Sequence, residues 1–69
     1  MKQFAIIPRD QRDIIQELEG CVERLEHSRI KVYVSHRGHG YGILWAEDSA
    51  FSVLTSAGFN VAPLTRRSI

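Results

Sequence analysis

Cysteine is almost absent from this chain of 69 residues. Cys21 is the only one, so no internal disulfide can stabilise the fold, and we expect Cys21 to be a small buried residue within a helix. No apolar run approaches the roughly 20 residues of a membrane-spanning helix, and the first residues have no signal-peptide pattern. Neither charge predominates, since nine Lys and Arg stand against eight Asp and Glu. These absences predict a reduced, cytoplasmic protein without strong electrostatic attraction to nucleic acids or membranes.

Sequence patterns for catalysis, cofactors and metals are missing as well. No Ser-His-Asp, Cys-His or paired-carboxylate arrangement has suitable spacing, and no glycine-rich loop precedes a helix to hold phosphate. His36 and His39 stand three residues apart, but a zinc site needs at least three protein ligands and no third one lies near in sequence. We therefore expect a non-enzymatic protein without cofactor or metal, whose two histidines lie at a solvated turn.

Enough apolar residues are present for one small core. Hydrophobic residues make up 43% of the chain and charged residues 25%, which is ordinary for a globular protein. A core of this size contributes only a few kcal/mol of net stability, so a partner chain or a ligand is a plausible further source. We expect a single domain over residues 1–69, with 65–69 as a flexible tail.

Short apolar runs predict four strands, at residues 4–7, 30–34, 41–46 and 60–64. Residues 35–40 are expected to form the turn of a hairpin, and Pro63 is expected to place the last strand at a sheet edge. Whether Tyr33, Tyr41 and Trp45 lie together on an exposed face or inside the core depends on the hairpin register, because a one-residue shift reverses every side chain.

Two helices separate these strands. The first is predicted to begin at an N-cap on Asp10 and to carry an apolar stripe from Ile14 to Leu25. Gly20 lies within it and predicts a close packing contact. The second begins near residues 47–49 and ends at Gly58, a glycine suited to the left-handed C′ position. Four glutamates of the first helix are expected on its solvated face: Glu17, Glu19, Glu23 and Glu26.

The order β-α-β-β-α-β predicts an α+β two-layer sandwich of ferredoxin-like topology. A four-stranded antiparallel sheet then has both helices on one face, and its other face is open. Open faces and edge strands are places where a second chain associates. A small basic patch is also expected from four residues: Lys31, Arg37, Arg66 and Arg67.

The run from Gly42 to Leu44, followed by residues 48–61 with an Ala-Gly-Phe-Asn-Val turn, resembles the second half of an ACT domain. Residues 30–32 are similar to the start of that family's second strand. The resemblance implies a regulatory module that binds amino acids or similar small ligands, commonly between paired domains. The ligand usually contacts the turn after the first strand, where this chain has Arg9, Asp10 and Arg12 but lacks the family's glycine after Pro8. In place of the missing glycine, we expect Arg9 or Arg12 to hold a carboxylate and Asp10 to hold an amino group.

Residues 39–46 are also similar to the RNP1 signature of RNA-recognition motifs, which share this topology and stack bases on sheet aromatics. The sequence departs from that signature at Ile43 and Ala46. Phe4 would be the aromatic residue of the first strand.

Three hypotheses follow. The first is a non-enzymatic regulatory module, a homodimer that binds a small ligand through Arg9, Asp10 and Arg12. The second is a protein-interaction module or small inhibitor that docks through its hairpin and sheet. The third is a binder of RNA or single strands. The residues expected to contact a partner or a nucleic acid are Tyr33, Arg37, Tyr41 and Trp45, with Phe4 added for nucleic acid.

Overall fold

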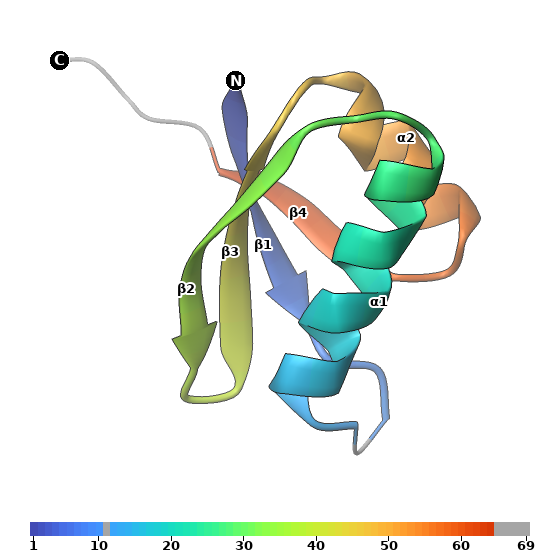
Figure 1. Ribbon diagram of the computed structural model, residues 1–69. Helices are drawn as coiled ribbons and strands as arrows, with labels where there is room; N and C mark the ends of the chain where they lie inside the picture. The colour runs from blue at the N-terminus through green and yellow to red at the C-terminus, as the bar shows by residue number, and fades with distance from the viewer. Residues whose placement is uncertain (11, 65–69) are drawn as a thin grey trace, which may run out of the picture.

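Strands and helices follow one another in the predicted order in the computed structural model, which describes residues 1–10 and 12–64 (Figure 1). The described elements are β1 (Lys2–Ile7), α1 (Ile14–His27), β2 (Val32–Gly38), β3 (Tyr41–Ala46), α2 (Ser49–Ser56) and β4 (Asn60–Leu64). The four strands form one antiparallel sheet in the order β2-β3-β1-β4. This arrangement confirms the predicted α+β fold of ferredoxin-like topology, with β4 at an edge. Gln11 and the expected tail at 65–69 lie outside the described residues.

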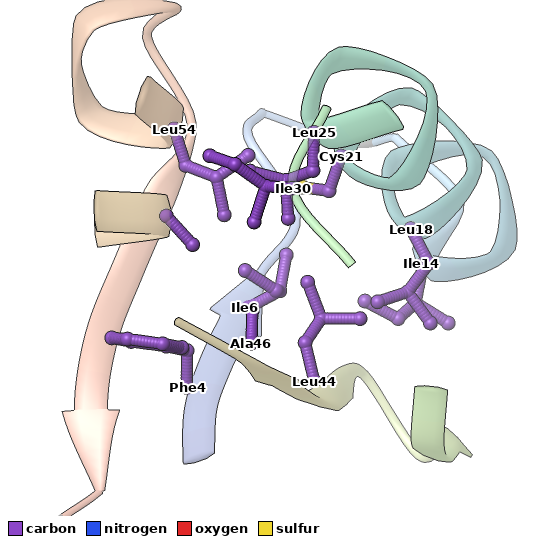
Figure 2. Close-up of a cluster of buried hydrophobic side chains, with 11 residues drawn as sticks. Phe4, Ile6, Ile14, Leu18, Cys21, Leu25, Ile30, Leu44, Ala46 and Leu54 are labelled. Carbon is purple, nitrogen blue, oxygen red and sulfur yellow. The ribbon is translucent and has the colours of Figure 1, made fainter. Parts of the chain in front are cut away.

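The core lies between the sheet and the two helices, which cover the same sheet face (Figures 1 and 2). Alternation along β1 buries Phe4 and Ile6, and alternation along β3 buries Leu44 and Ala46. The helices contribute the other large part of the core: Ile14, Leu18, Cys21, Leu25, Ala50 and Leu54. The expected burial of Cys21 is confirmed, since its side chain has no exposed surface.

The first helix begins later than the sequence predicted. Its N-cap is Asp13, whose carboxylate accepts a hydrogen bond from the Ile15 amide at 3.2 Å. Asp10, the predicted cap, instead has a φ of 56° within the turn that connects β1 to α1. The prediction at Asp10 was wrong because the chain first makes a turn, in which the Arg12 amide bonds the Arg9 carbonyl at 3.1 Å.

The end of α2 has the predicted geometry. Gly58 has a φ of 91°, and its amide bonds the Thr55 carbonyl while the Phe59 amide bonds the Leu54 carbonyl, both at 3.0 Å. These two bonds define a Schellman motif. The Phe59 ring then packs on α1, where its Cζ atom lies 3.2 Å from the place that a Cβ on Gly20 would take. The close contact predicted at Gly20 is therefore confirmed.

The hairpin differs from the prediction in its turn. β2 continues to Gly38, and only His39 and Gly40 form the connection, with φ values of 54° and 83°. Two residues with positive φ are typical of a type I′ turn, whose twist matches that of the flanking strands. The predicted loop over 35–40 was too long because a bulge between Val34 and His36 interrupts the alternation of β2.

Candidate functional site

The pairing of β2 with β3 brings the hairpin aromatics together on the face of the sheet that the helices leave open. Tyr33 pairs with Trp45, and the buried residues of β3 alternate with Tyr41, Ile43 and Trp45. The exposed fractions are 59% for Tyr33 and 38% each for Tyr41 and Trp45. The sequence left open whether these three aromatic side chains lie in the core or on an exposed face, and the structure places all three on the exposed face.

The bulge in β2 exchanges the faces of the next two residues. Beyond it, His36 pairs with Ile43 on the open face, and Arg37 pairs with the buried Gly42 on the helix side. Strict alternation from Tyr33 would have placed Arg37 beside the aromatics. The structure therefore separates Arg37 from the three aromatic residues with which the sequence grouped it.

His36 joins the aromatic group directly. The His36 ring stacks on the Tyr41 ring with centroids 4.5 Å apart. The centroid of the His39 ring lies 6.4 Å from that of His36. The Nε2 atom of His36 is buried and has no hydrogen-bond partner among the described residues. Within this part of the chain, no three His, Cys, Asp or Glu side chains gather closely enough to hold a metal ion.

The open face continues without charge across the other two strands. β1 buries alternate residues, and its other residues pair with Trp45 and Ile43 on one side and with β4 on the other, so they and their β4 partners line the same surface as the hairpin aromatics. We use "open face" for this set: Gln3, Ala5, Ile7, Tyr33, His36, Tyr41, Ile43, Trp45, Asn60, Ala62 and Leu64. None of these described residues is Asp, Glu, Lys or Arg. The open face is therefore a largely apolar surface with three exposed aromatic rings.

A second site lies at the turn after β1, and a buried carboxylate organises it. The Oε2 atom of Glu17 accepts hydrogen bonds from the Arg9 amide at 3.0 Å and from Arg9 Nε at 2.9 Å. Arg12 Nη1 lies 3.7 Å from the other carboxylate oxygen. The structure thus brings two of the three predicted ligand residues around Glu17, while Asp10 lies exposed in the turn.

Glu17 was wrongly expected on the solvated face of the helix, because only 3% of it is exposed. It follows Ile14 by three residues and precedes Cys21 by four, and this spacing places all three on the buried side of α1. The three other glutamates of the predicted set are exposed, as expected. Helical spacing together with an arginine in the preceding turn was the signal that could have identified Glu17.

The surroundings of Glu17 keep it ionised. Burial alone would raise the pKa of its carboxyl, but the hydrogen bonds from Arg9 and the charges of Arg9 and Arg12 outweigh it, so that the pKa is lowered. The bond to Glu17 in turn raises the pKa of Arg9. Burial raises the pKa of the nearby Cys21 thiol to about 12. The Arg9–Glu17 pair is therefore a fixed ion pair at neutral pH, and Cys21 is a protonated core residue.

Arg9 also forms one wall of a cleft. Its guanidinium carbon lies 4.4 Å from the centre of the Phe59 ring, which is a cation–π contact. A cleft of about 410 Å³ opens beside this pair, over Gly20 and between the helices. Arg24 and His27 line it together with Glu23. Asp10 and Arg12 do not line this cleft, so Arg9 is the predicted ligand residue that the cleft includes.

Comparisons with known proteins found no matching family model, no matching curated protein and no matching solved structure. No helix among the described residues is long and apolar enough to cross a membrane.

Proposed function

We propose that this chain is a non-enzymatic binding module that associates with a second copy through its open face. One observation carries the proposal: a four-stranded sheet exposes Tyr33, Tyr41 and Trp45 on a face whose described residues include no ionic side chain. The largest contiguous apolar patch on a monomeric protein typically covers about 300–600 Å² and is often an interaction or binding site.

A second copy suits this surface because its described residues carry no charge. When the same face meets itself, no like charges are therefore brought together. Interface cores are depleted of charged residues and enriched in Tyr and Trp, as this face is. Four strands spaced by about 4.8 Å, with about five residues each at 3.3 Å, cover roughly 320 Å² of flat area. Protruding side chains make the accessible area of the face larger than this flat area, but the interface still lies at the small end of the known size range. We therefore expect a dimer with a dissociation constant in the micromolar range.

Sedimentation equilibrium between low and high micromolar concentrations tests the proposal. The wild-type chain should change from monomer to dimer, and Tyr33→Lys should remain monomeric because it buries an unpaired charge in the interface. Tyr33 is 59% exposed, so the same substitution should leave the monomer folded. Ser52→Lys adds an equal charge on the exposed surface of α2 and should dimerise like the wild type.

A monomeric wild-type chain at every concentration would refute self-association. So would a dimer that Tyr33→Lys and Ser52→Lys weaken equally, because the contact would then lie elsewhere. A different protein that displaces the second copy from the open face would favour the second hypothesis, the interaction module or inhibitor.

A small carboxylate ligand, such as an amino acid, is the second candidate, and the cleft beside Arg9 supports it. The cleft has two arginines and a histidine against one glutamate. Glu17 uses Nε and Nη2 of Arg9, and Nη1 makes no hydrogen bond to another described residue. A carboxylate would bind there and at Arg24, with an amino group opposite Glu23. In this arrangement Arg12 would act indirectly, by holding Glu17, and Asp10 would border the turn.

Calorimetric titration with single amino acids tests this candidate. At least one should bind, and Arg24→Gln should weaken its binding, while Lys31→Gln, an exposed change outside this cleft, should not. If no amino acid binds, or if both variants bind equally well, the candidate fails. The oligomeric state is measured separately, so the two proposals can fail independently.

Stacking of nucleic-acid bases is the third candidate, favoured by the shared exposure of the hairpin aromatics. Tight binding also requires cations near the phosphates, and the open face has none in the described residues. Short oligonucleotides that quench Trp45 fluorescence in a salt-dependent way would support this candidate in place of the dimer.

A further inference from the structure

A groove runs along α1 on the side that faces the outer strand of the sheet. It encloses about 490 Å³ between α1 and β2. Its apolar lining comes from Ile15, Leu18 and Val22 on the helix and from Val34 on the strand. Ile15 is 36% exposed, so α1 presents apolar surface here in addition to the side that faces the core.

The charge of this groove differs from that of the whole chain. Glu19, Glu23 and Glu26 line it and are exposed, and Arg37 is its single cation. No glutamate of the three is within ion-pair distance of a cation in the described part of the chain. The chain has a net charge of +1, but three carboxylates against one guanidinium make the groove acidic. The occupant that complements it is apolar on one side and basic beside it.

The spacing of the glutamates indicates the form of that occupant. They lie four and three residues apart, which places them in one row along α1 over about 10 Å of helix at 1.5 Å per residue. A second helix lying alongside repeats its side chains at the same interval. An added strand fits less well, because the bulge at Val34 and His36 interrupts the free edge of β2.

We propose that this groove binds a cationic amphipathic helix of a partner protein. Its apolar side would cover Ile15, Val22 and Val34, and Lys or Arg at positions i, i+4 and i+7 would face the three glutamates. A helix of a second copy does not meet this description, because α1 is acidic along this row and α2 has no charged residue. The inference is independent of self-association, which uses the opposite face of the sheet.

The test uses a designed peptide of about four helical turns, with leucines at i, i+3 and i+7 and lysines in the flanking row. Fluorescence anisotropy should show saturable binding, and circular dichroism should show that the peptide gains helix when bound. A matched peptide of the same length with glutamate in place of lysine should bind at least tenfold more weakly. One exposed ion pair changes affinity by about 1.5- to 5-fold, so Glu19→Gln, Glu23→Gln and Glu26→Gln together should weaken binding about tenfold.

Two controls make the test specific. Glu47→Gln removes one exposed carboxylate that does not line the groove and should bind the peptide like the wild type. Ile15→Ser should weaken binding without unfolding the chain, since Ile15 is not part of the buried core. Binding weaker than about 1 mM would overturn the proposal, as would equal affinity for the lysine and glutamate peptides. So would a bound peptide without helix, or amide shifts on the open face instead of the groove.

Discussion

Replacing Gly42 with alanine tests how α1 is seated on the sheet. A Cβ added at Gly42 would lie 2.7 Å from both Cδ atoms of Leu18 and 2.9 Å from its Cγ, whereas carbon atoms in contact are about 3.5–4.0 Å apart. Leu18 is only 3% exposed and packed in the core, so either its side chain must leave its present conformation or the helix must shift. Gly42 does not have a positive φ, so any penalty comes from packing.

The expected cost is an overpacking penalty of about 1–3 kcal/mol in the free energy of unfolding. For a domain of this size that lowers the melting temperature by roughly 5–20 °C. The sign of the change is informative, because replacing glycine with alanine within a strand otherwise raises the free energy of unfolding by about 0.5–1 kcal/mol. Urea unfolding followed by Trp45 fluorescence measures the difference.

A double-mutant cycle identifies the contact. Leu18→Ala alone should cost about 2–5 kcal/mol because it leaves a cavity. In the double variant the new methyl group at Gly42 partly fills that cavity, so the combined cost should be smaller than the sum. Additive costs would refute the argument, because they would mean that the two side chains do not meet.

Two further predictions concern the two buried titratable side chains of α1, Glu17 and Cys21. Because its pKa is lowered in the folded chain, Glu17 stabilises the fold fully above its ordinary pKa of about 4.3, and this contribution is lost as the pH falls through the lower folded value. Glu17→Gln should therefore reduce the loss of stability on acidification, and equal acid sensitivity of wild type and Glu17→Gln would contradict this. Cys21, with its pKa raised to about 12 by burial, should not react with a thiol reagent at pH 8 until the chain unfolds, and rapid labelling of the native protein would show that the site opens.

The sequence predicted the element order and most of the core because periodicity reports directly which side of an element is buried. It also predicted two local features correctly, the stop at Gly58 and the close contact at Gly20, since glycine there has a specific steric reason. It did not predict the burial of Glu17. A carboxylate on the apolar stripe is stable only with a partner, and that partner, Arg9, comes from a turn whose path is set by the tertiary fold.

The surface of the hairpin was beyond sequence reasoning for a different reason. The exposure of Tyr33 and Trp45 required the register, which tertiary pairing determines. The position of Arg37 required the bulge, which shifts the alternation by one residue and has no strong signature here. As a result the sequence grouped Arg37 with the aromatics, where a cation would favour nucleic acid. The described residues of that face are uncharged, and Arg37 lines the acidic groove on the helix side.

Deletion of Ser35 tests the role of the bulge directly. Val34 pairs with Leu44 and His36 with Ile43, so Ser35 is the additional residue, and without it the same partners can form a regular ladder. We expect His36 to remain on the open face and Arg37 on the helix side, because cross-strand partners share a face. Nuclear Overhauser contacts between His36 and Ile43 should persist in the deletion variant. If they disappear and Arg37 instead contacts Tyr41, Ser35 is not the additional residue of the bulge. A regular β2 edge should also aggregate more readily, because bulges protect edge strands from pairing, and light scattering against the wild type measures this.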